Sequence, residues 1–127
     1  MLQSIFSKIQ RAPTVIRNRQ IQSLTKDITP AELYQKLQSN EPLLLVDVRF
    51  PDEYAAGHIL GSRLLPLPHL RQRSRELPQD LPIVCICRSG RRSLAACEQL
   101  ANQGFTDLMN LSGGMLDWDR AQLPVQR

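Results

Sequence analysis

Two cysteines, a glycine and three arginines lie close together in the stretch CICRSGRRS, residues 85–93. The thiolate is the nucleophilic form of cysteine, and nearby cations or a helix N-terminus lower the pKa of a thiol. The arginines that follow Cys87 are Arg88, Arg91 and Arg92. Gly90, between them, lets the backbone curl so that successive N–H groups point inward and bind an anion. The stretch therefore predicts that Cys87 is an activated nucleophile in an anion-binding cradle.

The flanking elements place this cradle where a strand ends and a helix begins. Residues 81–87 form an apolar run typical of a strand buried on both faces, and residues 93–104 have the pattern of a helix. In open α/β sheets, ligand sites form at the carboxyl ends of strands, and helix N-termini bind anions. The predicted substrate-binding residues are Arg88, Ser89, Gly90, Arg91, Arg92 and Ser93. By themselves these residues also fit a basic surface loop around a buried cysteine, and that alternative stays open here.

The same alternation of strands and helices runs from Asp27 to the end of the chain. One helix is expected from Thr29, which can form a capping box with Glu32, to Asn40. A further helix is expected to start at Pro51, and others to span residues 68–77, 93–104 and 115–122. Strands are expected over residues 43–48, 63–67, 81–87 and 105–111. This pattern predicts an α/β fold around a largely parallel sheet.

Composition restricts the class of protein. The 127 residues fit a single domain, with 42% hydrophobic residues and a net charge of +4. The charge favours a small anionic partner, but aromatic residues make up only 5% and form no motif with the basic ones, so we expect no nucleic-acid partner. No apolar run has the length of a membrane-spanning helix, about 18 residues or more. We expect a monomer with no transmembrane segment.

The cysteines and histidines indicate neither a disulfide framework nor a metal site. The chain has three cysteines, Cys85, Cys87 and Cys97, which cannot all pair within one chain. This odd count favours a reducing compartment and hence a cytoplasmic protein. The spacing of the first two lacks the two-residue spacer common in zinc sites, and His58 and His69 are distant in sequence. We therefore expect no metal and no cofactor.

Residues 1–26 differ in composition from residues 27–127, which we treat as the single domain. This N-terminal extension carries basic residues and no acidic one, and its first apolar residues, from Leu2 to Ile9, have helical spacing. Such a composition is found in organelle transit peptides and in helices that dock on membrane surfaces, and it also fits a solvated tail. These interpretations stay open.

Three stretches of the chain resemble the rhodanese family, of the single-domain sulfurtransferase type. CRSGRRS, residues 87–93, resembles the active-site loop of that family. Residues 44–67 resemble its first signature, and NLSGGMLDW, residues 110–118, resembles its C-terminal signature. The resemblance covers about residues 27–123 and implies a central, largely parallel five-stranded sheet flanked by helices on both faces.

The resemblance also implies a reaction. Cys87 would accept a sulfane sulfur from a donor such as thiosulfate, hold it as a persulfide and pass it to cyanide or to a thiol acceptor. The amides of residues 88–93 would surround the sulfur, and Arg88 and Arg92 would bind the anionic donor, with a less defined role for Arg91. Related phosphatases place five residues between the cysteine and the arginine, whereas four separate Cys87 from Arg92, which favours sulfur over phosphate.

Two other functions stay open. The protein can instead be a persulfide carrier that receives sulfur from a desulfurase and delivers it to a partner enzyme, docked through the basic N-terminus or through residues 71–75. It can also be a non-catalytic rhodanese-like binding module, although such modules often lack the cysteine. Near the loop, Arg49 is expected to form an ion pair with Glu53. Structural roles are expected for Asp47, His58, Cys85, Cys97 and Trp118, and a turn at Gly113 and Gly114.

Overall fold

A computed structural model describes residues 25–127, and its centre is a five-stranded sheet in which every pair of neighbouring strands is parallel. The strands, in the order in which they lie in the sheet, are β1 (Thr25–Ile28), β5 (Leu108–Leu111), β4 (Ile83–Ile86), β2 (Leu44–Asp47) and β3 (Arg63–Leu64). The predicted α/β fold with a parallel sheet is confirmed. Because the strands are parallel, the carboxyl ends of β2, β4 and β5 meet at one edge of the sheet.

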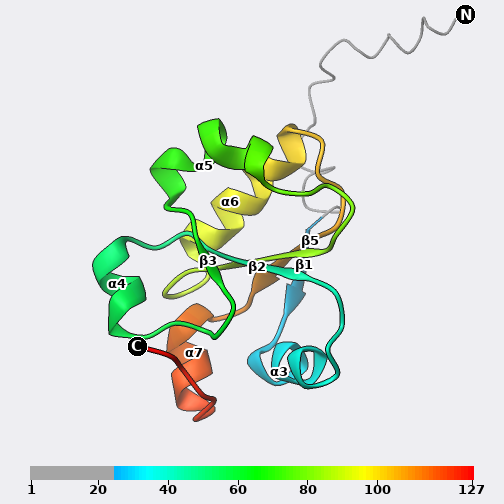
Figure 1. The fold of residues 1–127 in the computed structure, drawn as a ribbon. Helices are drawn as coiled ribbons and strands as arrows, with labels where there is room; N and C mark the ends of the chain where they lie inside the picture. The colour runs from blue at the N-terminus through cyan, green and yellow to red at the C-terminus, as the bar shows by residue number, and fades with distance from the viewer. Residues whose placement is uncertain (1–24) are drawn as a thin grey trace, which may run out of the picture.

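Helices cover both faces of this sheet, as Figure 1 shows. They are α3 (Pro30–Gln38), α4 (Pro51–Ala56), α5 (Leu67–Arg73), α6 (Arg91–Asn102) and α7 (Gly114–Arg120), with a short 3-10 turn η1 (Ser74–Glu76) after α5. One buried cluster joins the sheet to α5 and α6 through residues such as Leu70 and Leu100. A second joins the opposite face to α3 and α7 through residues such as Leu33 and Trp118. The sheet is thus buried on both faces, which explains its continuous apolar runs.

Local sequence signals account for the start and end of α3. The Oγ1 of Thr29 accepts the N–H of Glu32 at 3.1 Å, and the Glu32 carboxylate accepts the N–H of Thr29 at 2.9 Å, so the predicted capping box forms. Asn40, with φ of 54°, follows the helix in the left-handed region, where asparagine is tolerated better than most residues. The capping box and the turn at Asn40 fix the length of α3 between β1 and β2.

The structure differs from the sequence prediction at one edge of the sheet. No strand was predicted at residues 25–28, yet β1 pairs there with β5, with Thr25 opposite Leu108. The first strand therefore begins two residues before the predicted start of the domain. The strands β4 and β5 are also shorter than predicted, and Phe105, ahead of β5, is buried in the core without strand pairing. The predictions about the basic N-terminal extension concern residues 1–24, which lie outside the described residues.

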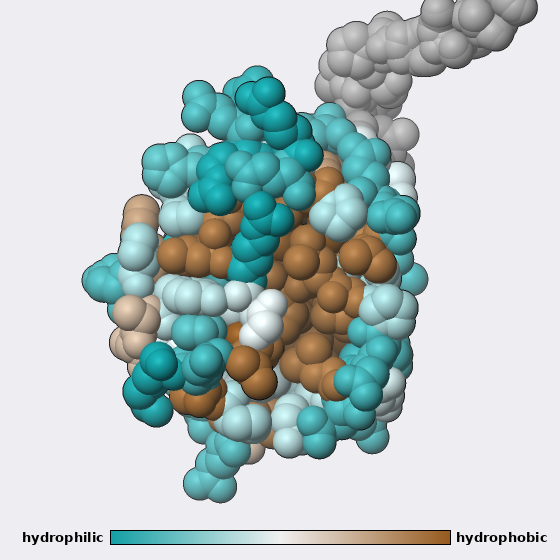
Figure 2. Space-filling model, in the orientation of Figure 1, coloured by the Kyte–Doolittle hydropathy of each residue, from teal (hydrophilic) through white to brown (hydrophobic). Residues whose placement is uncertain are grey.

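The surface is polar over the helices and apolar at the open edge of the sheet. In the view of Figure 2, hydrophobic residues gather across the middle of the molecule, over the edge formed by β2 and β3. The short β3 pairs only with Val46 and Asp47, which leaves the first half of β2 uncovered on that side. Across residues 25–127, no helix is long and apolar enough to cross a membrane.

Candidate active site

The loop that carries Cys87 connects β4 directly to α6. Cys87 follows the last residue of β4, and α6 begins at Arg91 after Gly90, whose φ of 99° is in the left-handed region. A side chain there would be strained, and a Cβ would also lie 3.3 Å from the backbone nitrogen of Gly113. Arg91, Arg92 and Ser93 therefore lie in the first turn of α6. The predicted arrangement of strand end, glycine turn and helix start is present.

The thiol of Cys87 lies inside this turn and receives hydrogen bonds from it. The residue is only 1% exposed, and its Sγ accepts the backbone N–H of Gly90 at 3.0 Å. The Oγ of Ser93 lies 3.2 Å from the same sulfur. Burial raises the pKa of the Cys87 thiol, but hydrogen bonds from the Ser93 hydroxyl and from the backbone N–H groups of Ser93, Gly90 and Ser89 lower it more. The net effect is a pKa below the usual value, which favours a reactive thiolate.

The cationic side chains contribute differently from the prediction. Arg92 was expected to face the donor, but both its terminal nitrogens donate to the carboxylate of Glu53, at 2.9 and 2.8 Å. Arg88 and Arg91 are exposed, and neither is paired with a carboxylate of residues 25–127. The loop thus has two free cations, and the third is already neutralised by a partner from α4.

The expected ion pair between Arg49 and Glu53 is wrong. Arg49 is buried and binds Asp47 instead, with its Nη2 2.8 Å from the Asp47 Oδ2 and its Nε 2.9 Å from Oδ1. The Nη2 of Arg49 also donates to the carbonyl oxygen of Gly57 at 2.8 Å. Asp47 is fully buried at the end of β2, so a nearby cation is needed to stabilise its charge. Glu53 is consequently free to bind Arg92.

The first turn of α7 is hydrogen-bonded to the backbone of the Cys87 loop. It donates two backbone hydrogen bonds to the loop, from Met115 N–H to the carbonyl of Cys87 at 2.8 Å and from Leu116 N–H to that of Arg88 at 3.0 Å. Gly114 makes this approach possible, because a Cβ at that position would lie 2.4 Å from the Cys87 carbonyl oxygen. The glycine pair that the sequence presented as a turn therefore fixes the backbone beneath Cys87, a role that sequence reasoning missed.

A buried polar chain lies behind the sulfur. Ser93 donates its hydroxyl hydrogen to the Oδ1 of Asn110, and the Nδ2 of Asn110 donates to the carbonyl of Gly90 at 3.2 Å. Ser93 is fully buried and Asn110 is 6% exposed. Asn110 belongs to β5 and was not among the predicted site residues. Its signal in the sequence is its place as the first residue of NLSGGMLDW, the stretch that resembles the C-terminal signature.

The remaining predicted structural residues lie in the core or near it. Cys85 and Cys97 are unpaired and fully buried, and burial together with a hydrogen bond to Cys97 raises the pKa of Cys85, with the hydrogen bond as the larger cause. The Nδ1 of His58 lies 2.8 Å from the carbonyl oxygen of Tyr54, which confirms its hydrogen-bonded role. Trp118 is 1% exposed and donates to the carbonyl of Pro124. Within the described residues, His, Cys, Asp and Glu form no group of three that could hold a metal.

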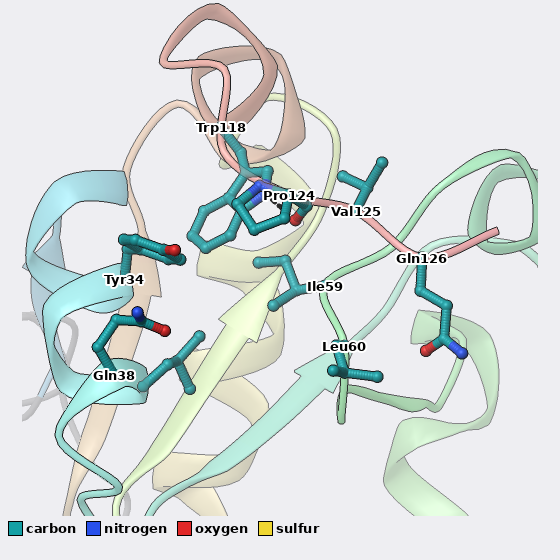
Figure 3. Close-up of a pocket in the computed structure, with 9 residues that line it drawn as sticks. Tyr34, Gln38, Ile59, Leu60, Trp118, Pro124, Val125 and Gln126 are labelled. Atoms are coloured by element: carbon teal, nitrogen blue, oxygen red, sulfur yellow. Dashed lines mark hydrogen bonds between the residues drawn. The ribbon is translucent and has the colours of Figure 1, made fainter.

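A hollow in the surface lies away from the loop that carries Cys87. It has a volume of about 540 Å³, lies between α3 and α7, and is lined mainly by apolar residues that include Tyr34, Ile59 and Trp118 (Figure 3). None of the residues 87–93 lines it. This hollow has no nucleophile and no charged side chain among its lining residues. The chemistry therefore points to the loop at Cys87.

Comparisons with known proteins agree with this fold. The model of the rhodanese-like domain family matches residues 29–121. The chain belongs to the rhodanese-like domain family. A protein of Allochromatium vinosum named as a sulfurtransferase is 40% identical over 102 residues, which cover 80% of this chain and 95% of that protein. A protein of Pseudoalteromonas translucida named thiosulfate sulfurtransferase GlpE is 35% identical over 86 residues, covering 68% of this chain and 82% of that one.

A solved structure supports the same assignment. The crystal structure of a rhodanese-related protein from Thermoplasma volcanium is similar with a TM-score of 0.73 and 32% sequence identity, covering 80% of this chain and 97% of that one. The rhodanese-like fold is therefore shown by sequence and by structure. The sulfurtransferase relatives support a transferase activity for this member of the family.

Proposed function

We propose that the protein is a sulfurtransferase in which Cys87 carries the sulfur as a persulfide. The observation that supports this most directly is the position of the Cys87 sulfur, which accepts the Gly90 N–H at 3.0 Å within a turn that opens a helix. The amides that lower the pKa of the thiol can also surround a second, negatively charged sulfur bonded to it. The free cations of Arg88 and Arg91 can attract an anionic donor.

The proposed reaction needs no oxidant. The Cys87 thiolate attacks the outer sulfur of thiosulfate, a new sulfur–sulfur bond forms, and sulfite leaves with the electron pair of the broken bond. The persulfide then carries one negative charge on its outer sulfur. A thiolate or cyanide attacks that sulfur, and the Cys87 thiolate leaves, so that the loop returns to its starting state. Thiosulfate is the proposed donor because its sulfonate end suits the two cations and because one relative is named for this substrate.

Phosphate chemistry fits the loop less well. Only four residues separate Cys87 from Arg92, and both terminal nitrogens of Arg92 already donate to Glu53. A phosphate group has three peripheral oxygens and needs a wider ring of donors. If the group cannot sit close to the sulfur, the rate falls steeply, since small misplacements of reacting atoms are costly.

The test compares three cysteine variants in an assay with thiosulfate as donor and cyanide as acceptor. Cys87→Ser is expected to lose turnover, whereas Cys85→Ser and Cys97→Ser are expected to keep most of it where they fold. Substantial turnover in Cys87→Ser would reject the proposal. If wild-type protein accepts sulfur from a persulfide donor but not from thiosulfate, the persulfide carrier function is favoured instead.

A further inference from the structure

The hydroxyl of Ser93 has two neighbours that can use its single hydrogen. One is the sulfur of Cys87, 3.2 Å from the Ser93 Oγ, and the other is the Oδ1 of Asn110. A hydroxyl donates one hydrogen bond at a time, and a thiolate and an amide oxygen can only accept. The orientation of Asn110 is fixed, because its Nδ2 must face the carbonyl of Gly90. The Ser93 hydroxyl lowers the pKa of Cys87 only in the orientation in which it donates to the sulfur, and Asn110 competes with the thiolate for that hydrogen.

We propose that Asn110 is a positioning residue that restrains Cys87, because it holds the hydrogen of the Ser93 hydroxyl away from the free thiolate. This inference rests on the proposed function only in the statement that the persulfide is the loaded state of Cys87. The competition itself is a property of the resting protein and can be measured without sulfur transfer. Asn110 acts through Ser93, since no hydrogen bond joins it to the sulfur among the described contacts.

The protonation state of the sulfur decides which bond the hydroxyl makes. In the thiol state, the S–H of Cys87 can donate to the Ser93 Oγ while Ser93 donates to Asn110, and every group has a partner. In the thiolate state, the Ser93 hydroxyl has two orientations. If its hydrogen stays on Asn110, a lone pair of Oγ faces the negative sulfur. If its hydrogen turns to the sulfur, the Oδ1 of Asn110 loses its donor. A buried acceptor without a donor is unfavourable, and Asn110 is only 6% exposed. Asn110 thus favours the thiol over the thiolate.

The persulfide removes this conflict. When Cys87 carries a second sulfur, the negative charge lies on the outer atom and the inner sulfur is neutral. Ser93 can then keep its bond to Asn110, and the outer sulfur can accept the backbone N–H groups of the turn. The pair Ser93 and Asn110 therefore favours the loaded state over the free thiolate.

Other charged groups near the sulfur do not obscure this effect. Asp47 at the end of β2 is paired with Arg49, and Glu53 on α4 is paired with Arg92 on α6. From β4, Cys85 faces the same core, and its pKa is raised by Cys97 and by burial, so it stays protonated while Cys87 titrates. Arg88 and Arg91 are exposed and are paired with no carboxylate of residues 25–127. Asp117 on α7 lies beside Gly113 with Arg120 as its partner.

The experiment measures how fast iodoacetamide alkylates Cys87 in the full-length protein as a function of pH, with fragment masses separating Cys87 from Cys85. Asn110→Leu removes the amide and frees the Ser93 hydroxyl to donate to the thiolate. We expect the alkylation midpoint to move to lower pH, with a rate about tenfold higher at a pH below the wild-type midpoint, because the cost of the orphaned acceptor is gone. Asn110→Val tests the same loss with a side chain that suits a strand.

Two comparisons separate this role from a general loosening of the loop. Leu108→Ala weakens the same strand opposite Ile83, at the far end of β4, and should not move the midpoint. In a Ser93→Ala background, Asn110→Leu should cause no further shift, because the hydroxyl that links the two residues is absent. An unchanged midpoint in both Asn110 variants, a shift to higher pH, or an equal shift with and without Ser93 would overturn the proposal. These outcomes do not depend on whether thiosulfate is a substrate, so they are distinguishable from failure of the proposed function.

Discussion

The ion pair between Glu53 and Arg92 joins α4 to the first turn of α6, and its removal should destabilise the protein in a way that depends on pH. The two side chains meet through two short hydrogen bonds and are 26% and 31% exposed. The hydrogen bond from Arg92 is the main cause that lowers the pKa of Glu53 from 4.5 to about 2. A Glu53→Gln variant keeps the shape of the side chain and removes its charge.

The loss of stability in Glu53→Gln can be estimated from the lowered pKa of Glu53. The full shift corresponds to about 3 kcal/mol at 1.36 kcal/mol per unit, and screening by solvent reduces this to about 1–2 kcal/mol. For a domain of this size, such a loss lowers the melting temperature by about 4–10 °C. Since the pKa of Glu53 is lower in the folded state, the stabilisation is fully present above pH 4.5 and is lost as the pH falls toward 2.

The assay is thermal unfolding of wild type and Glu53→Gln between pH 7 and pH 2.5, with Glu76→Gln as the matched control. Glu76 forms ion pairs with Arg63 and Arg73 on an exposed surface, so its loss should change the melting temperature little. The difference between wild type and Glu53→Gln should be largest near neutral pH and shrink in acid. Equal melting temperatures at pH 7, or a difference that persists unchanged to pH 2.5, would refute the reasoning.

Further predictions concern the loop, the donor and the N-terminus. Gly114→Ala should lower both the melting temperature and sulfur transfer, because its Cβ would lie 2.4 Å from the Cys87 carbonyl oxygen. Gly61 is also in the left-handed region, with φ of 87°, but its Cβ would meet nothing within 4 Å, so Gly61→Ala controls for backbone strain: it should lower the melting temperature and leave transfer unchanged, and an equal loss of transfer in both variants would contradict this account. Arg88→Ala and Arg91→Ala should each reduce kcat/KM for thiosulfate about tenfold, as expected for one charge-assisted hydrogen bond, and unchanged values in both would reject their role. A chain that begins at Thr25, the first residue of β1, should keep its melting temperature and activity, and loss of both would show that residues 1–24 belong to the domain.

Those parts of the structure that depend on neighbours in sequence could be predicted. The apolar run before Cys87, the glycine at residue 90 and the helix that follows are local signals, and the capping box at Thr29 is another. The edge strand β1 could not be found in this way, because Lys26 and Asp27 are exposed and only Ile28 is fully buried. Its pairing with β5 supplies the signal that the local sequence lacks.

The polar contacts of the candidate site could not be predicted, because they join residues that only the fold brings together. Glu53 and Arg92 are 39 residues apart, and Asn110 lies 17 residues beyond Ser93, so no spacing rule links either pair. Glu53 was assigned to the wrong arginine because Arg49 is nearer in sequence, whereas the buried Asp47 has the stronger need for that cation. The lowered pKa of Cys87 was expected from the arginines, whereas hydrogen bonds from Ser93 and from the turn are the main causes that lower it.

The most direct test of the central claim is the mass of the protein after incubation with thiosulfate and no acceptor. The account predicts that one sulfur atom is added, that fragment masses place it on Cys87, and that cyanide removes it with release of thiocyanate. Sulfur on Cys85 or Cys97 in place of Cys87, or no cyanide-labile sulfur on Cys87 with thiosulfate or any other sulfane donor, would contradict it.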